Sequence, residues 1–196
     1  MQWEQNKSIA HYATSDLRQV TSPPLAEFIN LQVYIMSGKK DTWFNLLQCT
    51  SYATNAGLLY FITKRLIGGK SYCWFSVLLF ISMPIAFGEA LTTQVDHFST
   101  MWLLMFVYFL LDILDLEYHL TISKDSILKV IILSSCIGFG YLAKPSILFA
   151  IVFFALWLLG VCIYRKDKVK DIIFLIVLAA SIICLIVFPT PVFDFL

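Results

Sequence analysis

Residues 72–116 read YCWFSVLLFISMPIAFGEALTTQVDHFSTMWLLMFVYFLLDILDL, two apolar runs separated by an acidic, polar turn from Glu89 to His97. Each run, 72–91 and 97–116, is about 20 residues long, the length that a helix needs to cross ~30 Å of hydrocarbon. The turn therefore places the carboxylate of Asp96 where lipid gives way to water. An ionisable group is costly in such a place, so it marks a candidate functional site.

Further apolar runs of similar length lie on both sides of this hairpin, at 44–63, 127–143, 146–164 and 171–189. The chain is 59% hydrophobic and only 14% charged, whereas about a quarter of the residues in a soluble domain are charged. The sequence therefore predicts an all-α polytopic membrane protein with about six transmembrane helices. These helices would make up a transmembrane domain over residues 44–196.

The runs at 127–143 and 146–164 could form one long helix, but Lys144 and Pro145 lie near its middle. A lysine at the centre of a bilayer costs ~2.5–3.5 kcal/mol, and proline favours the start of a helix. A hairpin with Lys144 at its tip is therefore predicted.

Residues 1–43 form a more polar arm ahead of the first apolar run. Within it, Ser22-Pro23-Pro24 is a helix-start signal and Gly38 a stop signal. An amphipathic helix at about 23–37, lying along the membrane interface, is predicted, with Glu27 in its first turns. Its apolar face at helical spacing would consist of Leu25, Phe28, Ile29, Val33 and Met36.

The distribution of lysine and arginine predicts the orientation, because basic residues accumulate in cytoplasmic loops. With the arm outside, the inner loops hold Lys64, Arg65, Lys70, Lys124, Lys129, Arg165, Lys166, Lys168 and Lys170. The outer side then holds Lys7, Arg18, Lys39, Lys40 and Lys144. This orientation makes the arm extracytoplasmic and places it on the same membrane face as Asp96 and Lys144.

Each candidate residue has a structural and a functional interpretation. Asp96 is either the capping or first-turn acid of the following helix, or a carboxylate that orients an acceptor hydroxyl or a partner base. Lys144 is either an interfacial anchor or part of an anion site at the start of a helix. Arg18 suits phosphate, and Glu27 could simply complement a helix dipole.

Several classes of site are not indicated by the sequence. Neither a Walker loop nor a GxGxxG, GxSxG or HExxH pattern is present, and no basic stripe suggests nucleic acid. The histidines lack metal-ligand spacing, so no metal site is predicted: His11, His97 and His119. The cysteines lie in apolar runs without CxxC spacing, and we expect small core residues rather than disulfides: Cys49, Cys73, Cys136, Cys162 and Cys184.

Three segments, in this order, resemble one family of proteins. The arm contains Arg18-Gln19 followed by Ser22-Pro23-Pro24-Leu25-Ala26-Glu27-Phe28; Thr93-Gln94-Val95-Asp96 and Gly138-Phe-Gly140-Tyr-Leu-Ala-Lys144-Pro145-Ser146 follow. Together they resemble bacterial polytopic glycosyltransferases of the GT-C superfamily. The similarity is to the family 39 type, related to protein O-mannosyltransferases and lipid A aminoarabinose transferases.

The resemblance implies transfer of a sugar from a polyprenyl-phosphate carrier to a glycan, lipid or protein acceptor on the non-cytoplasmic side, with inversion. It implies Asp96 as a second acidic residue of the catalytic pocket and Glu27 as a residue that holds the acceptor or supports the pocket. Arg18 and Lys144 would bind the carrier phosphate, and Gln19 and Gln94 would hydrogen-bond substrate.

The same resemblance implies no cofactor beyond the lipid-linked sugar donor and a place in the bacterial inner membrane.

Departures from the family pattern lead to further expectations. Family members are roughly twice as long and begin with a span followed by an acidic motif that supplies the main base, so we expect a fragment truncated at both ends and inactive alone. The family commonly has Thr-Lys-Pro where this chain has Ala143-Lys144-Pro145. The alternatives to a glycosyltransferase are a transporter or flippase, and a catalytically inactive membrane fragment.

Overall fold

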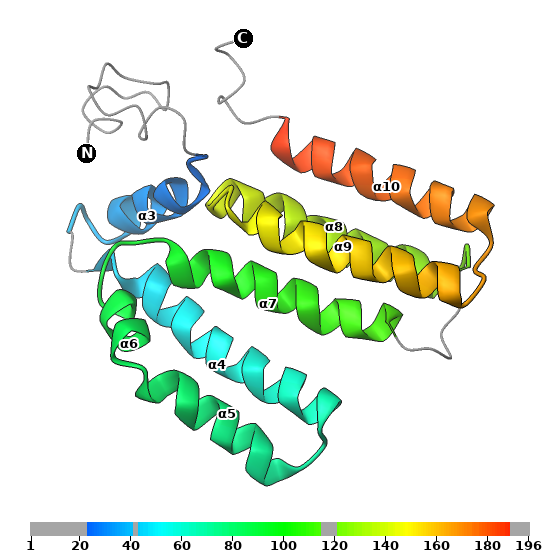
Figure 1. The fold of residues 1–196 in the computed structure, drawn as a ribbon. Helices are drawn as coiled ribbons and strands as arrows, with labels where there is room; N and C mark the ends of the chain where they lie inside the picture. The colour runs from blue at the N-terminus through cyan, green and yellow to red at the C-terminus, as the bar shows by residue number, and fades with distance from the viewer. Residues whose placement is uncertain (1–22, 41–42, 115–120, 189–196) are drawn as a thin grey trace.

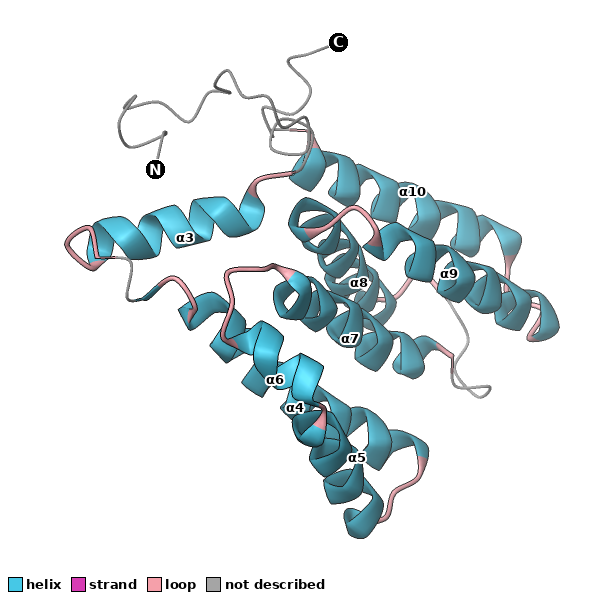
Figure 2. Cartoon of the chain, turned by 60° about the vertical axis from the view of Figure 1, so that its left-hand side comes forward, coloured by secondary structure: helices cyan, strands magenta, loops and turns pink. Residues whose placement is uncertain are grey.

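The computed structural model describes residues 23–40, 43–114 and 121–188, and these ranges contain helices and connections but no strand (Figures 1 and 2). Arg18 and Gln19 lie outside the described residues. In chain order the helices are α3 (Leu25–Met36), α4 (Leu46–Leu66), α5 (Lys70–Ser82), α6 (Pro84–Ala90), α7 (Asp96–Ile113), α8 (Lys124–Ala143), α9 (Ile147–Tyr164) and α10 (Val169–Val187).

The long helices pack side by side in the order α5, α4, α7, α8 and α10, and α9 lies over α7 and α8 (Figure 1). Helix α8 is the centre of one half of the bundle, with extensive contacts to both α7 and α10. The core between these helices is built from apolar side chains, among them Phe106, Leu110, Ile113 and Leu133. The predicted all-α class is confirmed.

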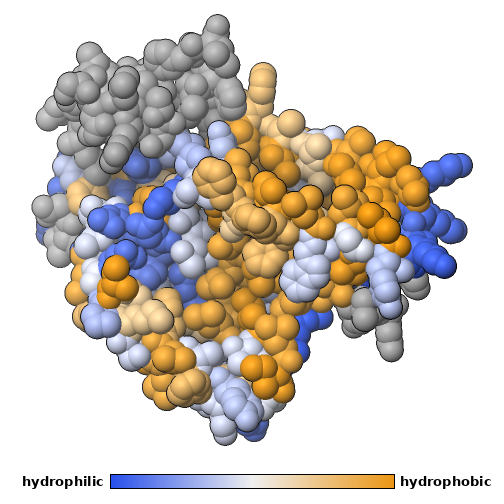
Figure 3. All heavy atoms as spheres, in the orientation of Figure 1, coloured by the Kyte–Doolittle hydropathy of each residue, from blue (hydrophilic) through white to orange (hydrophobic). Residues whose placement is uncertain are grey.

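Four helices are long and apolar enough to cross a membrane by length and composition: α7, α8, α9 and α10. A fifth span results if the bent pair of α5 and α6 is taken as one. Many large apolar side chains of these helices are exposed, and Figure 3 shows a broad apolar surface between two hydrophilic ends. The protein is an integral multi-pass membrane protein, although the prediction of about six spans is not confirmed.

The predicted span at 72–91 is not one continuous helix, because the chain bends by 68° between α5 and α6. Pro84 begins α6, and Met83 before it is extended (φ −72°, ψ 114°). Proline lacks the N–H that would continue the hydrogen-bond ladder and pushes the preceding residue out of the helical region. The helix therefore ends at Ser82 and restarts in another direction.

The predicted helix of the arm is present, but its first residue and part of its apolar face differ from the prediction. Helix α3 starts at Leu25, two residues later than predicted, and Gly38 (φ +72°) follows its end as expected of a stop signal. Its buried residues are Ala26 and Leu31, whereas Met36 of the predicted apolar face is exposed. Leu25 and Ile29 of the predicted face do pack, together with Ala26, against α7 and α8.

The predicted hairpin at Lys144 is confirmed, since α8 ends at Ala143 and α9 begins at Ile147. It defines what we call the Lys144 end of the bundle, where α6 also leads to α7 and where α3 lies (Figure 1). At the opposite, Arg165 end, α4 leads to α5 and α9 leads to α10.

The Arg165 end carries most of the described basic residues: Lys64, Arg65, Lys70, Lys124, Lys129, Arg165, Lys166, Lys168 and Lys170. Two polar contacts hold helix ends together there. Arg65 of α4 is ion-paired with Asp112 of α7. The buried Arg165 donates from Nη1 to the carbonyl oxygen of Ile113 at 2.8 Å, which satisfies one of the free carbonyls at the C-terminus of α7.

Glycine at position 138 lets α8 and α10 approach closely. A Cβ at Gly138 would lie 2.9 Å from Cγ2 of Ile186, whereas a Cβ at Gly160 in α9 would meet nothing within 4 Å. Small residues at such contacts are what allow helices to pack tightly in membranes.

We therefore expect Gly138→Leu to lower the free energy of unfolding by about 1–3 kcal/mol through overpacking. Gly160→Leu is the matched control and should leave stability nearly unchanged. The thermal midpoint of the detergent-solubilised protein, followed by size-exclusion chromatography after heating, checks both. An equal loss in the two variants would contradict the assigned contact between α8 and α10.

Candidate functional site

Two of the predicted site residues meet at the Lys144 end. Asp96 is the first residue of α7, and Lys144 follows the last residue of α8. The Nζ of Lys144 donates to Oδ1 of Asp96, forming an ion pair between positions 48 residues apart. Both side chains are partly exposed, 42% for Lys144 and 32% for Asp96, so another molecule can reach the pair.

Local backbone rules set the position of each partner. Pro145 disfavours a helical conformation at the residue before it, and Lys144 is extended (φ −159°, ψ 113°) where α8 stops. Asp96 lies in the first turn of α7, where the helix dipole favours a negative charge. The structure thus confirms Asp96 as a first-turn acid and also gives it a cationic partner.

Helix α3 packs beside this pair. Ala26 is buried together with Phe98 of α7 and Ala143 of α8, which are close in sequence to Asp96 and Lys144 respectively. Glu27 follows Ala26 and is in the first turn of α3, as predicted. The packing of α3 therefore brings Glu27 to the same end of the bundle as the Asp96–Lys144 pair.

Glu27 differs from an ordinary surface carboxylate. Part of its side chain is exposed, yet neighbouring atoms remove enough water to raise the pKa of its carboxyl above the usual value. A hydrogen bond from a backbone N–H opposes this rise by favouring the charged form. A raised pKa is a property that suits a carboxyl group that accepts or shares a proton.

Gln94 lies in the turn that precedes α7. Its backbone N–H donates to Oγ1 of Thr92 at 3.3 Å, and its side chain is exposed. Within the described part of the chain, the Gln94 side chain makes no hydrogen bond to Asp96 or Lys144. The predicted roles of Arg18 and Gln19 fall outside the described residues.

The sequence interpretation missed a line of polar side chains on α4. Gln48, Tyr52 and Asn55 follow one another at helical spacing and face α5 and α7. Gln48 Oε1 accepts from the backbone N–H of Phe98 at 3.1 Å, and Asn55 Nδ2 donates to the carbonyl oxygen of His97 at 3.0 Å. Tyr52 donates to the carbonyl oxygen of Ile81 at 3.3 Å. The signal was present as polar residues spaced three to four apart inside the apolar run at 44–63.

His97 continues this network into α6. Its ring is buried, and Nε2 lies 2.7 Å from the carbonyl oxygen of Ala86. A carbonyl can only accept, so Nε2 is the nitrogen that carries the proton. His97 therefore has a structural bond that links α6 to α7, and among the described residues no group of three or more His, Cys, Asp or Glu could hold a metal ion.

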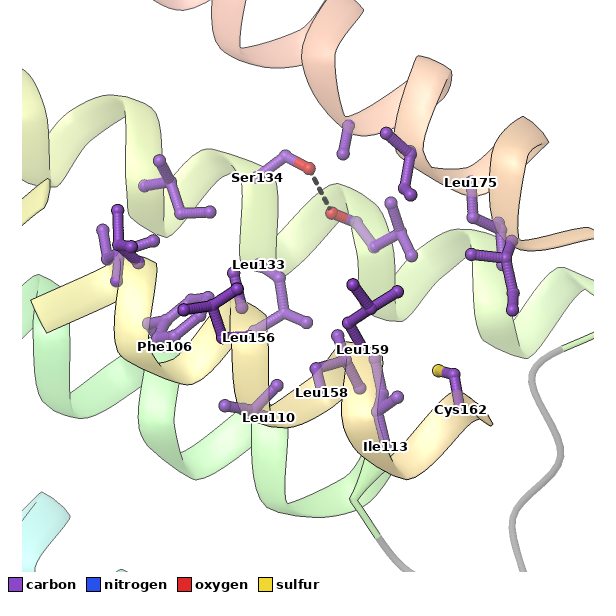
Figure 4. Close-up of a pocket in the computed structure, with 18 residues that line it drawn as sticks. Phe106, Leu110, Ile113, Leu133, Ser134, Leu156, Leu158, Leu159, Cys162 and Leu175 are labelled. Carbon is purple, nitrogen blue, oxygen red and sulfur yellow. Dashed lines mark hydrogen bonds between the residues drawn. The ribbon is translucent and has the colours of Figure 1, made fainter. Parts of the chain in front are cut away.

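A cavity of about 450 Å³ lies away from the ion pair, among α7, α8, α9 and α10 (Figure 4). Its lining is almost wholly apolar, with Phe106, Leu133, Leu156 and Leu175 among the side chains. Ser134 has the one hydroxyl in this lining, and that hydroxyl donates to the carbonyl oxygen of Val130 at 2.7 Å. Such a cavity suits hydrocarbon and offers nothing for a charged group.

Comparison with known proteins gives one match. The family model described as dolichyl-phosphate-mannose-protein mannosyltransferase matches residues 21–192, which is most of the chain. No curated protein and no solved structure matches it. The expected resemblance to GT-C glycosyltransferases of the family 39 type is thereby confirmed. The chain belongs to the dolichyl-phosphate-mannose-protein mannosyltransferase family, a family of membrane glycosyltransferases.

Proposed function

We propose that the protein transfers a sugar from a polyprenyl-phosphate carrier to a glycan, lipid or protein acceptor on the non-cytoplasmic face of the bacterial inner membrane. The observation that carries this proposal is the Asp96–Lys144 ion pair at the end of the bundle opposite the basic loops. Family membership supports the reaction class, and the ion pair supplies the charged groups that this reaction needs.

Lys144 would bind the phosphate of the carrier. An ammonium group has three N–H donors, and one of them is directed to Asp96. The other two remain for phosphate oxygens, and the partial exposure of Lys144 allows a ligand to approach. Cationic groups that stabilise the charge developing on a leaving phosphate lower the barrier to its departure.

Transfer would proceed by a single displacement that inverts the sugar. The acceptor oxygen bonds to the anomeric carbon from the face opposite the phosphate, and the bond from that carbon to the phosphate oxygen breaks with its electron pair on the phosphate. The acceptor proton goes to a carboxylate. We infer that Asp96 holds Lys144 in place as the second acid of the pocket, and that Glu27, with its raised pKa, holds the acceptor or supports the pocket.

The remaining predicted residues complete the proposed site. Arg18 would add a second cation for the phosphate, and Gln19 and Gln94 would hydrogen-bond the sugar. Because Lys144 and Arg18 would supply the positive charge, the proposal needs no cofactor beyond the lipid-linked donor. The apolar cavity among α7 to α10 fits a lipid-linked substrate, since only hydrocarbon matches its lining.

The proposed sidedness follows from the charges at the two ends. Basic loops stay in the cytoplasm, so the Arg165 end would be cytoplasmic and the Lys144 end, with the arm, non-cytoplasmic. If α4 and the bent pair α5–α6 both cross the membrane along with α7 to α10, the chain has six spans. The polar residues of α4 do not oppose this, because Gln48, Ser51 and Asn55 are buried against neighbouring helices. The exposed hydroxyls of Thr50 and Thr54 donate to carbonyls of the same helix.

A transporter is the alternative that the bent pair α5–α6 might suggest, because transporters bind substrates at broken helices. In those sites the free carbonyl groups at the break bind the ion. Here the carbonyl of Ile81, at the end of α5, accepts from Tyr52. A protein side chain therefore occupies one of the groups that an ion would use, which favours the transferase.

We expect Lys144→Gln to reduce kcat/KM for sugar transfer about 10²–10³-fold, the usual loss when one charge-stabilising donor is removed. Asp96→Asn should also reduce transfer, and the double variant should lose less than the product of the single losses, because the two side chains act as a pair. The assay follows a radiolabelled polyprenyl-phosphate sugar with the natural full-length protein in liposomes.

Lys40→Gln is the matched control, since Lys40 is an exposed lysine at the same end of the bundle. It should transfer at the normal rate. Normal transfer by a well-expressed Lys144→Gln protein would overturn the proposed site. Movement of the donor across the bilayer without any transfer would instead favour the transporter.

A second prediction concerns sidedness. Gln94→Cys, at the Lys144 end, should react with a membrane-impermeant maleimide in intact spheroplasts, and Lys168→Cys, at the Arg165 end, should react only after the membrane is opened. Both variants are made after replacement of the exposed Cys49 and Cys184. The reverse pattern of labelling would place the candidate site in the cytoplasm and contradict the proposal.

A further inference from the structure

The start of helix α7 is capped from another helix. The residue before its first turn, Val95, makes no side-chain cap, so the helix has no local acceptor for its free N–H groups. Ser99 makes the first backbone bond, to the carbonyl oxygen of Val95. Phe98 N–H therefore lies among the unpaired donors of the first turn, and Gln48 of α4 supplies its acceptor at 3.1 Å.

This arrangement leaves Asp96 available for Lys144. Aspartate is one of the residues that most often cap helix starts through their own side chains, but the Asp96 carboxylate accepts from Lys144 Nζ instead. Gln48 performs the capping that Asp96 does not. Asn55, two turns further along α4, holds the same turn by donating to the carbonyl oxygen of His97.

The burial of the two amides shows that they are oriented by α7. Gln48 is 2% and Asn55 0% exposed. The other polar atom of each side chain, Gln48 Nε2 and Asn55 Oδ1, has no hydrogen-bond partner among the described residues. A buried unpaired polar atom is costly, so each amide is kept for the one hydrogen bond that it makes to the first turn of α7.

We propose that Gln48 and Asn55 are positioning residues that fix the first turn of α7, so that the Asp96 carboxylate is aimed at Lys144. Gln48 is the more direct of the two, because it holds the backbone two residues after Asp96. The importance of this positioning for sugar transfer rests on the proposed function. The geometry of the ion pair does not, and it can be tested without any substrate.

The test measures how fast Lys144 is acetylated by acetic anhydride in the reconstituted protein, with the modified peptide quantified by mass spectrometry. The ion pair holds the Lys144 amine against the Asp96 carboxylate, which hinders its approach to the anhydride. Asp96→Asn should therefore increase the rate severalfold, and Gln48→Met should give a similar increase. Gln48→Glu retains an acceptor oxygen at the same place and should stay close to wild type.

Two comparisons separate positioning from a general loss of structure. Thr54→Val removes a hydrogen bond from the exposed side of the same helix and should not change the acetylation of Lys144. In an Asp96→Asn background, Gln48→Met should give no further increase, because its effect passes through Asp96. Asn55→Leu, measured in the same way, serves if Gln48→Met fails to fold.

Wild-type acetylation of Lys144 in Gln48→Met, with faster acetylation in Asp96→Asn, would overturn the proposal. So would an increase in Gln48→Met that persists in the Asp96→Asn background. If Lys144 and Asp96 variants transfer sugar normally but the acetylation results hold, the proposed function fails while Gln48 remains a positioning residue. If the Lys144 and Asp96 variants lose transfer but Gln48→Met leaves acetylation unaltered, the proposed function stands and the positioning role of Gln48 fails.

Discussion

Backbone groups released at a helix end must find partners, and next to hydrocarbon water cannot supply them. The segment from α5 to the start of α7 contains two such interruptions, at Pro84 and at the turn before Asp96. Helix α4 satisfies both with side chains: Tyr52 binds the carbonyl before the break, and Gln48 and Asn55 bind the first turn of α7. The polar composition of α4 is therefore a requirement of the fold, and the position of Asp96 depends on it.

The sequence was informative where one residue controls the backbone. Pro145 after Lys144 indicated the hairpin between α8 and α9, and Gly38 indicated the end of α3, because each effect is local. Pro84 carries the same kind of signal, but the run at 72–91 was interpreted from its length alone. Periodicity could not show which polar residues of α4 would face α7, since that depends on a contact between segments about 50 residues apart.

In the candidate site, too, local features could be predicted from the sequence and contacts between distant segments could not. Charge distribution and topology predicted that Asp96 and Lys144 would share one membrane face, and the structure places them at one end of the bundle. Their direct pairing required the packing of α7 against α8, which no local pattern encodes. Glu27 reaches this end because Ala26, with Leu25 and Ile29 of the predicted apolar face, packs against Phe98 and Ala143. The apolar spacing of α3 indicated two of these residues, but it could not show which helices they would contact.

The two ends of the bundle use charge in different ways. At the Arg165 end, Arg165 caps the carbonyl of Ile113 and Arg65 pairs with Asp112, so these cations hold helix ends together. At the Lys144 end the capping is done by the neutral amides of α4, and the charged pair stays partly exposed. A charge that closes a helix end is committed to the fold, whereas Lys144 keeps donors that a phosphate can share. Neutral residues that take over the structural role at this end are what leave the charged residues free for chemistry.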